Sequence, residues 1–363
     1  MPNYQTQEIT EESGEPTGNN ATFNLGAGMV IDLEVPELED VGHPLVPDQN
    51  QDYMMREING TQDLKLLSYV IDDPDFFAML EGEAGVGKNM AVKTIASAAN
   101  WPMVRVNFGV GTTYQNLVGR YAPVDNDNTE EEALERSEAV RKTAQRMFEE
   151  NESMTMDKAV ELASRSLPSG NSFQWQDGLL TMAVKHGWLF VADEINAADE
   201  EAIMPLNGVT EDRNSRYLTI EELSQVIDPH PNFRFVATRN PVSYAGVSEM
   251  NDALQSRSYV IEFNYHENDA LEEILENNSD IIQNESEAAL QSLVSLIQDI
   301  RRQEQSGNEI ITRVSARDAI KICRLTDIME IREAAKTVIM GIADPTDKDS
   351  LRELIETQRF TAN

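Results

Sequence analysis

The fold of this chain is decided by the stretch Gly82-Glu83-Ala84-Gly85-Val86-Gly87-Lys88-Asn89. It fits the phosphate-loop pattern G-x-x-x-x-G-K-[ST] at every position except the last. In such a loop the glycines let the backbone turn tightly and direct its N–H groups at phosphate oxygens, while the lysine reaches the β- and γ-phosphates. We therefore predict a nucleotide site whose contacts come from residues 82–89 and from Met90, which opens the following helix.

The exception to the pattern is Asn89, which occupies the position where Ser or Thr is usual. The hydroxyl at that position normally holds Mg²⁺. The side-chain carbonyl of Asn89 is able to take the same position, directly or through a bridging water, and we predict Asn89 as a metal ligand on that basis. The alternative is that the amide slows hydrolysis and leaves a loop that binds nucleotide with little turnover.

The residues on either side of the loop supply the context that the motif requires. Residues 78–80 are a short apolar run typical of a buried strand, and residues 90–99 contain neither Pro nor Gly, as expected of a helix. The N-terminal end of that helix also favours a bound anion. A chance glycine-rich turn does not account for Lys88 in the same context.

The chain of 363 residues is strongly acidic, with 64 Asp and Glu against 29 Lys and Arg and a net charge of −35. Acidity spread over a whole sequence is typical of proteins from a high-salt cytoplasm, where the Debye length is about 3 Å at 1 M salt and self-repulsion is screened. The alternative is an acidic protein that binds basic partners. The sequence has no Lys/Arg cluster of the kind that phosphate backbones need, so its charge disfavours nucleic acid as a partner.

Three further features bound the location and organisation of the chain. The single cysteine, Cys323, excludes an intramolecular disulfide and a cysteine-based metal cluster. The sequence shows neither a signal peptide nor an apolar run of membrane-spanning length, which favours a cytoplasmic location. Residues 1–55 contain no Lys or Arg and are predicted as an acidic, partly disordered N-terminal extension, in which residues 29–35 are either an edge strand or a docking segment.

Four more apolar runs have the length and composition of buried strands, at residues 103–108, 188–192, 233–238 and 259–263. Helical patterns lie between them, so we predict an α/β fold with a five-stranded, largely parallel sheet in residues 56–265. An acidic helical insertion is predicted at 124–170. Strand signals then stop, and residues 266–363 are predicted as a small all-helical lid domain with helices at 269–277, 285–304, 315–326, 329–342 and 347–359.

Polar side chains follow two of the predicted strands. Asp193 and Glu194 come after the strand at 188–192, an arrangement that downstream of a phosphate loop is typical of the Walker B motif. Asp193 is then predicted to hold Mg²⁺, directly or through water, and Glu194 to polarise the attacking water as general base. Asn240 follows the strand at 233–238 and is predicted to orient that water. The alternative for Asn240 is a turn residue before proline.

The order of these motifs resembles the AAA+ ATPases of the MoxR and dynein-related branch. The resemblance extends over residues 60–340 and rests on the phosphate loop, on Asp193-Glu194-Ile195-Asn196, and on the segments 175–180, 230–241, 244–247 and 254–257. The stretch 243–247 is also similar to the AAA+ protein of gas-vesicle operons. Together with the acidity, the resemblance suggests an extreme halophile or its virus as the source.

The resemblance also implies roles for particular residues. Asn240 falls on the position called sensor 1, and Arg257 falls on the arginine finger, which reaches the ATP site of the neighbouring subunit. Arg317 falls on sensor 2 at the start of a lid helix, with Arg313 as a near competitor. Residues 205–231 fall on a hairpin-like insertion that faces the pore or a partner. For Arg257 the alternative is a surface salt bridge.

By the same resemblance, the chain is expected to bind ATP and Mg²⁺ between the subunits of a homo-hexamer, because an arginine finger acts in trans. Its expected function is to remodel, mature or activate a protein complex, with a protein client such as a metal-binding adhesion-domain protein. Two alternatives stay open. One is a low-turnover, nucleotide-dependent assembly or scaffold protein, which Asn89 favours. The other is a nucleic-acid motor of a virus or restriction-like system, which the charge disfavours.

Overall fold

The computed structural model describes residues 19–26, 29–35, 43–48, 53–73, 75–123, 141–146, 158, 160, 162, 173–241, 252–265, 268–277, 287–305 and 310–360. The chain divides into two compact units, one made of Met1–Thr113 with Met182–Asn363 and one made of Tyr114–Thr181. Residues 1–18 and the stretch 243–247 lie outside the described residues. In the described part of the chain, no helix has both the length and the apolar character that crossing a membrane requires.

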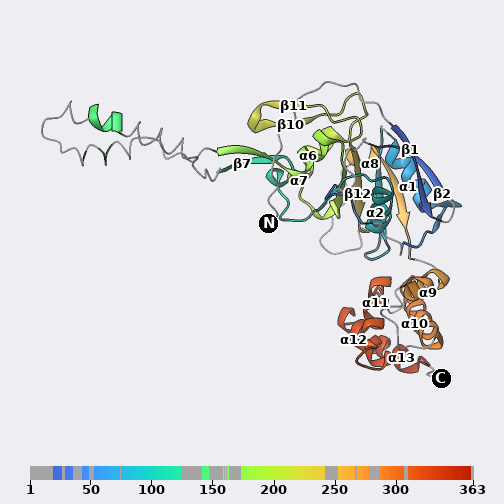
Figure 1. Ribbon diagram of the computed structural model, residues 1–363. Coiled ribbons are helices and arrows are strands. Elements are labelled where there is room, and N and C mark those ends of the chain that lie inside the picture. The colour runs from blue at the N-terminus through green and yellow to red at the C-terminus, as the bar shows by residue number, and fades with distance from the viewer. Residues whose placement is uncertain are drawn as a thin grey trace. The chain divides into compact units, whose positions relative to one another are not determined.

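A five-stranded parallel sheet forms the centre of the first unit (Figure 1). Its strands, in sheet order, are β13 (Ser258–Phe263), β5 (Phe77–Gly82), β12 (Arg234–Arg239), β9 (Leu189–Asp193) and β6 (Met103–Asn107). This confirms the predicted α/β fold. Parallel strands that are covered on both faces are built from near-continuous apolar runs, and the side chains of residues 78–80 and 189–192 are buried accordingly.

The register of the sheet brings the functional stretches to one edge. β5 ends at Gly82, where the phosphate loop begins, and β9 ends at Asp193. β12 ends at Arg239, which pairs with Glu81 of β5. Because the carboxyl ends of parallel strands meet at the same edge, the loop, the two carboxylates after β9 and Asn240 after β12 come together there.

Helices and small hairpins accompany the sheet in this unit. Among the described residues before 266, its helices are α1 (Asp63–Asp72), α2 (Lys88–Ala98), α7 (Glu200–Val209) and α8 (Asp252–Ser256), with the 3-10 helices η1 (Ile195–Ala197) and η2 (Glu221–Leu223). Helix α6 (Leu179–His186) begins in the other unit and ends in this one. Buried side chains of α1 and α2, such as Leu67 and Ile95, share one apolar cluster with Leu80 of the sheet.

Three antiparallel hairpins belong to the same unit. They are β1 (Asn19–Gly26) with β2 (Met29–Val35), β3 (Glu57–Ile58) with β4 (Thr61–Gln62), and β10 (Leu218–Ile220) with β11 (Gln225–Ile227). Residues 29–35 therefore form a strand, and Figure 1 shows the β1–β2 hairpin beside α1. The β10–β11 pair lies within residues 205–231, where a hairpin-like insertion is expected.

Residues 268–360 are helical wherever they carry regular secondary structure in the described part of the chain, as predicted for the lid. The helices are α9 (Asn268–Asn277), α10 (Glu287–Gln305), α11 (Ala316–Leu325), α12 (Ile331–Ile342) and α13 (Lys348–Thr357). They enclose a core of their own, which includes Leu293, Ile322 and Ile339. A capping box opens α11, since the Ser315 hydroxyl accepts from the Asp318 backbone N–H while the Asp318 carboxylate accepts from the Ser315 N–H.

The second unit contains α3 (Tyr114–Leu117), β7 (Gly119–Pro123) and β8 (Phe173–Asp177). β7 and β8 pair antiparallel, and the rings of Tyr121 and Trp175 pack edge to face with centroids 5.4 Å apart. Residues 141–146 are helical, within the span predicted as an acidic helical insertion. Apart from residues 158, 160 and 162, the rest of 124–170 lies outside the described residues.

Candidate nucleotide site

The loop between β5 and α2 is shaped by two glycines that no other residue replaces without strain. A Cβ atom on Gly82 would lie 2.2 Å from the carbonyl oxygen of Phe263 in the neighbouring strand β13. Gly87 caps α2 with φ at 97°, in the left-handed region that glycine adopts at low cost. The strand therefore passes directly into a tight turn and then into a helix whose first residue is Lys88.

Lys88 is the buried cation of the loop, with 7% of its surface exposed. Its ammonium group donates to the carbonyl oxygen of Gly82, to that of Glu83 at 3.0 Å and to Asn240 Oδ1 at 3.2 Å. Burial lowers the pKa of Lys88 to about 8, although nearby carboxylates, Asp193 first among them, oppose the shift. A phosphate anion beside the ammonium group would strengthen its charged form, so Lys88 is set to respond to nucleotide.

Thr238 of β12 organises the two carboxylates at the end of β9. Its hydroxyl donates to Asp193 Oδ1 at 2.5 Å and accepts from the Glu194 backbone N–H at 3.0 Å. Glu194 has φ at 56°, a left-handed conformation that costs of order 1–2 kcal/mol for a residue with a side chain. The two hydrogen bonds hold Glu194 in that conformation and direct its side chain into the site.

Asn240 connects the cation and the base. Its amide Nδ2 donates to Glu194 Oε1 at 3.2 Å, while its Oδ1 accepts from Lys88. The backbone of Asn240 is fixed by the buried side chain of Asn196, which donates to the Asn240 carbonyl at 2.9 Å and accepts from its N–H at 3.4 Å. These contacts define the orientation of the Asn240 amide, because its oxygen faces an ammonium group and its nitrogen faces a carboxylate.

Asn89, the residue that departs from the loop pattern, contacts the predicted metal carboxylate. Its Nδ2 donates to Asp193 Oδ2 at 2.8 Å. The opposite orientation of the amide would place Asn89 Oδ1 against the Asp193 carboxylate oxygen. Asp193 therefore determines that Nδ2, and not Oδ1, faces the carboxylate. Asn89 Oδ1 is buried and has no hydrogen-bond partner among the described residues. A buried, unpaired carbonyl oxygen beside a carboxylate is a donor set that suits Mg²⁺, which prefers oxygen ligands.

A comparison with protein families decides the class of this site. The family described as the AAA domain of the dynein-related subfamily matches residues 78–159 and 136–258. The chain carries an AAA domain. The match includes the phosphate loop, Asp193, Glu194, Asn240 and Arg257, and at this general level the family supports nucleotide-dependent ATPase activity.

The AAA domain also has relatives among curated proteins. An uncharacterized protein of Staphylococcus haemolyticus is 25% identical over 279 residues, which cover 77% of this chain and 89% of the relative. One from Staphylococcus epidermidis is 26% identical over 279 residues with the same coverage. A crystal structure of a candidate ATPase from Cytophaga hutchinsonii shows 16% identity and a TM-score of 0.39 over 82% of this chain and 89% of that chain.

Arg257 of the AAA domain lies apart from the phosphate loop of its own chain. It follows α8, where its backbone N–H bonds to the Leu254 carbonyl and its carbonyl accepts from Phe77 of β5. Its guanidinium Nη2 donates to Glu211 Oε1 at 2.5 Å. The structure does not bring Arg257 together with Lys88, Glu194 and Asn240, in keeping with a residue that is expected to serve a neighbouring subunit.

The two lid arginines differ in how they meet the loop. Arg313 forms an ion pair with Glu83 of the loop at 3.2 Å and a second one with Glu304 of α10 at 3.2 Å. Arg317 is exposed, and its Cβ lies 4.0 Å from the place where a Cβ on Gly85 would be. The ion pair with the loop thus belongs to Arg313, the residue that the sequence ranks second, while Arg317 borders the loop without such a bond in the described part of the chain.

Arg56 is a contact of the AAA domain's loop that sequence reasoning missed. Its guanidinium donates to the Val86 carbonyl at 2.5 Å and to the Asn264 carbonyl at 2.6 Å, and it lies 3.3 Å from the Asp63 carboxylate. Arg56 therefore ties the middle of the phosphate loop to the residue that follows β13. In the sequence it stands out only as the first Lys or Arg of the chain.

Proposed function

We propose that this chain is a cytoplasmic, ring-forming ATPase that hydrolyses ATP with Mg²⁺ and thereby remodels, matures or activates a protein complex. The AAA domain supports ATPase activity in general. The observation that carries the proposal is the continuous set of contacts from Lys88 through Asn240 to Glu194. It joins a phosphate-binding cation, an orienting amide and a general base within hydrogen-bonding distance of one another.

Each of these side chains has a task in hydrolysis. The Lys88 ammonium exchanges the loop carbonyls for oxygens of the β- and γ-phosphates. Glu194 takes a proton from the attacking water as the water oxygen bonds to the γ-phosphorus and the bond to ADP breaks. Asn240 holds the Glu194 carboxylate through Nδ2 and thereby sets its direction. Catalysis in such a site is largely positioning and charge stabilisation, which rigid contacts of this kind provide.

Asn89 and Asp193 are the residues that would hold Mg²⁺. The ion would neutralise charge on the β- and γ-phosphate oxygens. Among the described residues there is no group of three or more His, Cys, Asp or Glu side chains placed to hold a metal. One carboxylate and one amide carbonyl suit Mg²⁺ in nucleotide sites, where it is bound by one or two protein groups and by the phosphates.

The enzymatic part of the proposal is tested with Glu194→Gln. We expect Mg²⁺-dependent ATP hydrolysis by the natural chain and a loss of at least about 100-fold in turnover for the variant, because a general base contributes about 10²–10⁴ in rate. Binding of a fluorescent ATP analogue should persist. Absence of Mg²⁺-dependent hydrolysis in the natural chain, or equal turnover in the variant, would refute the remodelling enzyme.

The same assay separates the alternatives. If Asn89→Ser raises turnover sharply, the natural chain is a low-turnover assembly protein, whose amide restrains hydrolysis. If DNA stimulates hydrolysis in high salt, the motor reading is favoured, although the net charge of −35 argues against it. A protein client, with a metal-binding adhesion-domain protein as the first to be tried, should stimulate hydrolysis if remodelling is the function.

Mixing subunits of two variants tests whether Arg257 acts in trans, as expected in a homo-hexameric ring. Glu194→Gln removes the base from a subunit's own site, and Arg257→Ala removes the finger that it offers to its neighbour. Each variant alone should be nearly inactive. A mixture should recover part of the activity, because some sites then combine an intact Glu194 with an intact Arg257 from the next subunit. No recovery, in rings shown to exchange subunits, would refute a finger in trans.

A further inference from the structure

Glu211 is the direct partner of Arg257 and lies within residues 205–231, the expected insertion, where the sequence assigned it no role of its own. Arg257 Nη2 donates to Glu211 Oε1 at 2.5 Å, and the two side chains are 28% and 31% exposed. A guanidinium carries five N–H donors in a fixed planar fork, of which this contact uses one. Glu211 does not contact the remaining N–H donors. Because the guanidinium is planar and rigid, the one bond to Glu211 still restrains the direction in which those donors point.

Both ends of this ion pair are mounted on rigid backbone. On one side, Arg257 is fixed between the end of α8 and the start of β13 by its bonds to Leu254 and Phe77. On the other side, Glu211 follows Thr210, the residue that caps α7, and the Thr210 hydroxyl donates to the Leu206 carbonyl at 2.9 Å. The ion pair therefore connects two residues whose backbone is anchored. It differs in this from an ion pair between two mobile side chains on the surface.

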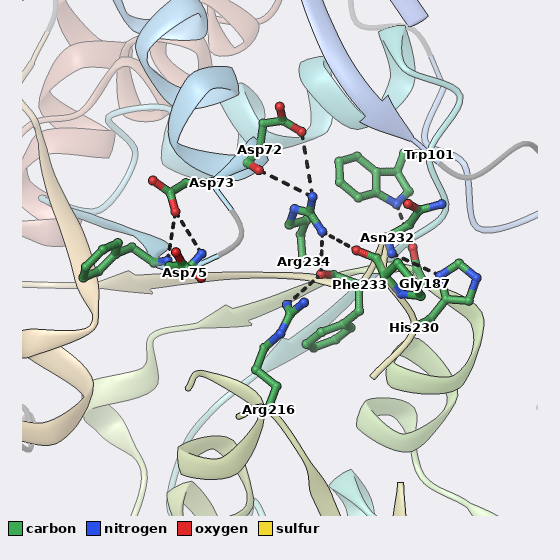
Figure 2. Close-up of polar contacts among 12 residues, drawn as sticks. Asp72, Asp73, Asp75, Trp101, Gly187, Arg216, His230, Asn232, Phe233 and Arg234 are labelled. Atoms are coloured by element: carbon green, nitrogen blue, oxygen red, sulfur yellow. Dashed lines mark hydrogen bonds and ion pairs between the residues drawn. The ribbon is translucent and has the colours of Figure 1, made fainter. Parts of the chain in front are cut away.

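The turn that carries Glu211 is itself tied to the sheet. The Tyr217 N–H bonds to the Gly208 carbonyl at 3.0 Å, which closes residues 208–217 into one loop. Arg216 donates to the Phe233 carbonyl at 3.3 Å, at the residue that precedes β12. Figure 2 shows Arg216 directed at the Phe233 carbonyl, which buried Arg234 contacts as well. This anchorage limits how far Glu211 can move.

We propose that Glu211 is the positioning residue of Arg257, orienting its guanidinium toward the nucleotide site of the neighbouring subunit; this rests on the proposed function. A free arginine on the surface samples many rotamers, and ordering it at the moment of reaction costs entropy. A charge-assisted bond to an anchored carboxylate orders it beforehand. Because an arginine finger contributes about 10³–10⁵ in rate, a modest loss of its alignment should be measurable.

The test compares Glu211→Ala, Glu211→Gln and a control, Glu353→Gln, which removes the same charge from an exposed position of α13. We expect Glu211→Ala to lower kcat by roughly 10–100-fold, since misplacement by about 1 Å costs about 10²-fold. KM and the affinity for a fluorescent ATP analogue should stay within about threefold. Glu211→Gln retains an acceptor oxygen and should recover part of the loss, and the control should behave like the natural chain.

A double variant separates positioning from general damage. In an Arg257→Ala background, Glu211→Ala should cause no further loss of kcat, because there is no guanidinium left to orient. Unchanged kcat in Glu211→Ala, or an equal loss in both backgrounds, would overturn the proposal. If Arg257→Ala alone leaves hydrolysis intact, the assignment of the finger fails instead, and that outcome is distinguishable from the failure of Glu211.

Discussion

Thr238→Val is the substitution that tests the architecture of the site most directly. Valine keeps the shape of threonine and removes the hydroxyl that donates to Asp193 and accepts from the Glu194 N–H. Loss of a hydrogen bond to a charged group costs about 1.5–3 kcal/mol, and an unsatisfied backbone N–H costs about 1–3 kcal/mol. We therefore expect the free energy of unfolding to fall by about 3 kcal/mol.

The control is Thr238→Ser, which retains the hydroxyl and loses one buried methyl group, at a cost of about 1 kcal/mol. Unfolding in urea should be followed by tryptophan fluorescence, because the chain's 3 tryptophans all precede the helical lid and report on the AAA part. In the same variants, kcat should fall about 10²-fold for valine, since Glu194 is released from its left-handed conformation, and much less for serine. A valine variant that matches the serine variant in both stability and kcat would refute the reasoning.

Three other predictions concern the loop. Gly82→Ala should prevent correct folding or lower the melting temperature strongly, because its Cβ would lie 2.2 Å from the Phe263 carbonyl; thermal unfolding tests this. The pKa of Lys88 is lowered to about 8 in the folded chain, so the unfolded chain binds the extra proton between about pH 8 and pH 10.5. Without nucleotide, the free energy of unfolding should rise with pH in that window, whereas the affinity for nucleotide should fall. Lys88→Met should abolish both trends. Asn89→Leu should weaken the dependence of nucleotide affinity on Mg²⁺, measured by titration of a fluorescent analogue.

The sheet and the helical lid were predictable from the sequence because their signals are local. Each core strand is a short apolar run, and each lid helix has apolar residues at helical spacing. The meeting of Lys88, Asp193 and Glu194 was predictable for a topological reason, since groups at the carboxyl ends of parallel strands share one edge. The left-handed conformation of Glu194 had no such signal.

The supporting contacts were not predictable in the same way, because they depend on which strands are neighbours. β12 lies between β5 and β9, an order that does not follow the chain. Only that order brings Thr238 beside the end of β9 and Asn240 within reach of Lys88. One signal for Thr238 was nonetheless present: a hydroxyl in a fully buried strand must find a hydrogen-bond partner, and a strand end next to Walker B offers carboxylates. Glu211 carried no signal at all, since its role depends on where α8 ends.

The structure also changes what Asn89 implies for turnover. A Ser or Thr hydroxyl at this position combines two abilities in one oxygen, since it donates a hydrogen bond and offers lone pairs to a metal. In Asn89 the same abilities are divided between two atoms: Nδ2 donates to Asp193, and Oδ1 has no hydrogen-bond partner in the part of the chain that the structure describes. Asp193, which would bind the metal together with Asn89, thus also fixes the orientation of the Asn89 amide. Loss of the Asp193 carboxylate should therefore free the Asn89 amide to rotate, so Asp193→Ala should impair Mg²⁺ binding by more than the loss of one ligand. The double variant Asp193→Ala with Asn89→Ala should then bind Mg²⁺-nucleotide no worse than Asp193→Ala alone, whereas independent ligands would give additive losses.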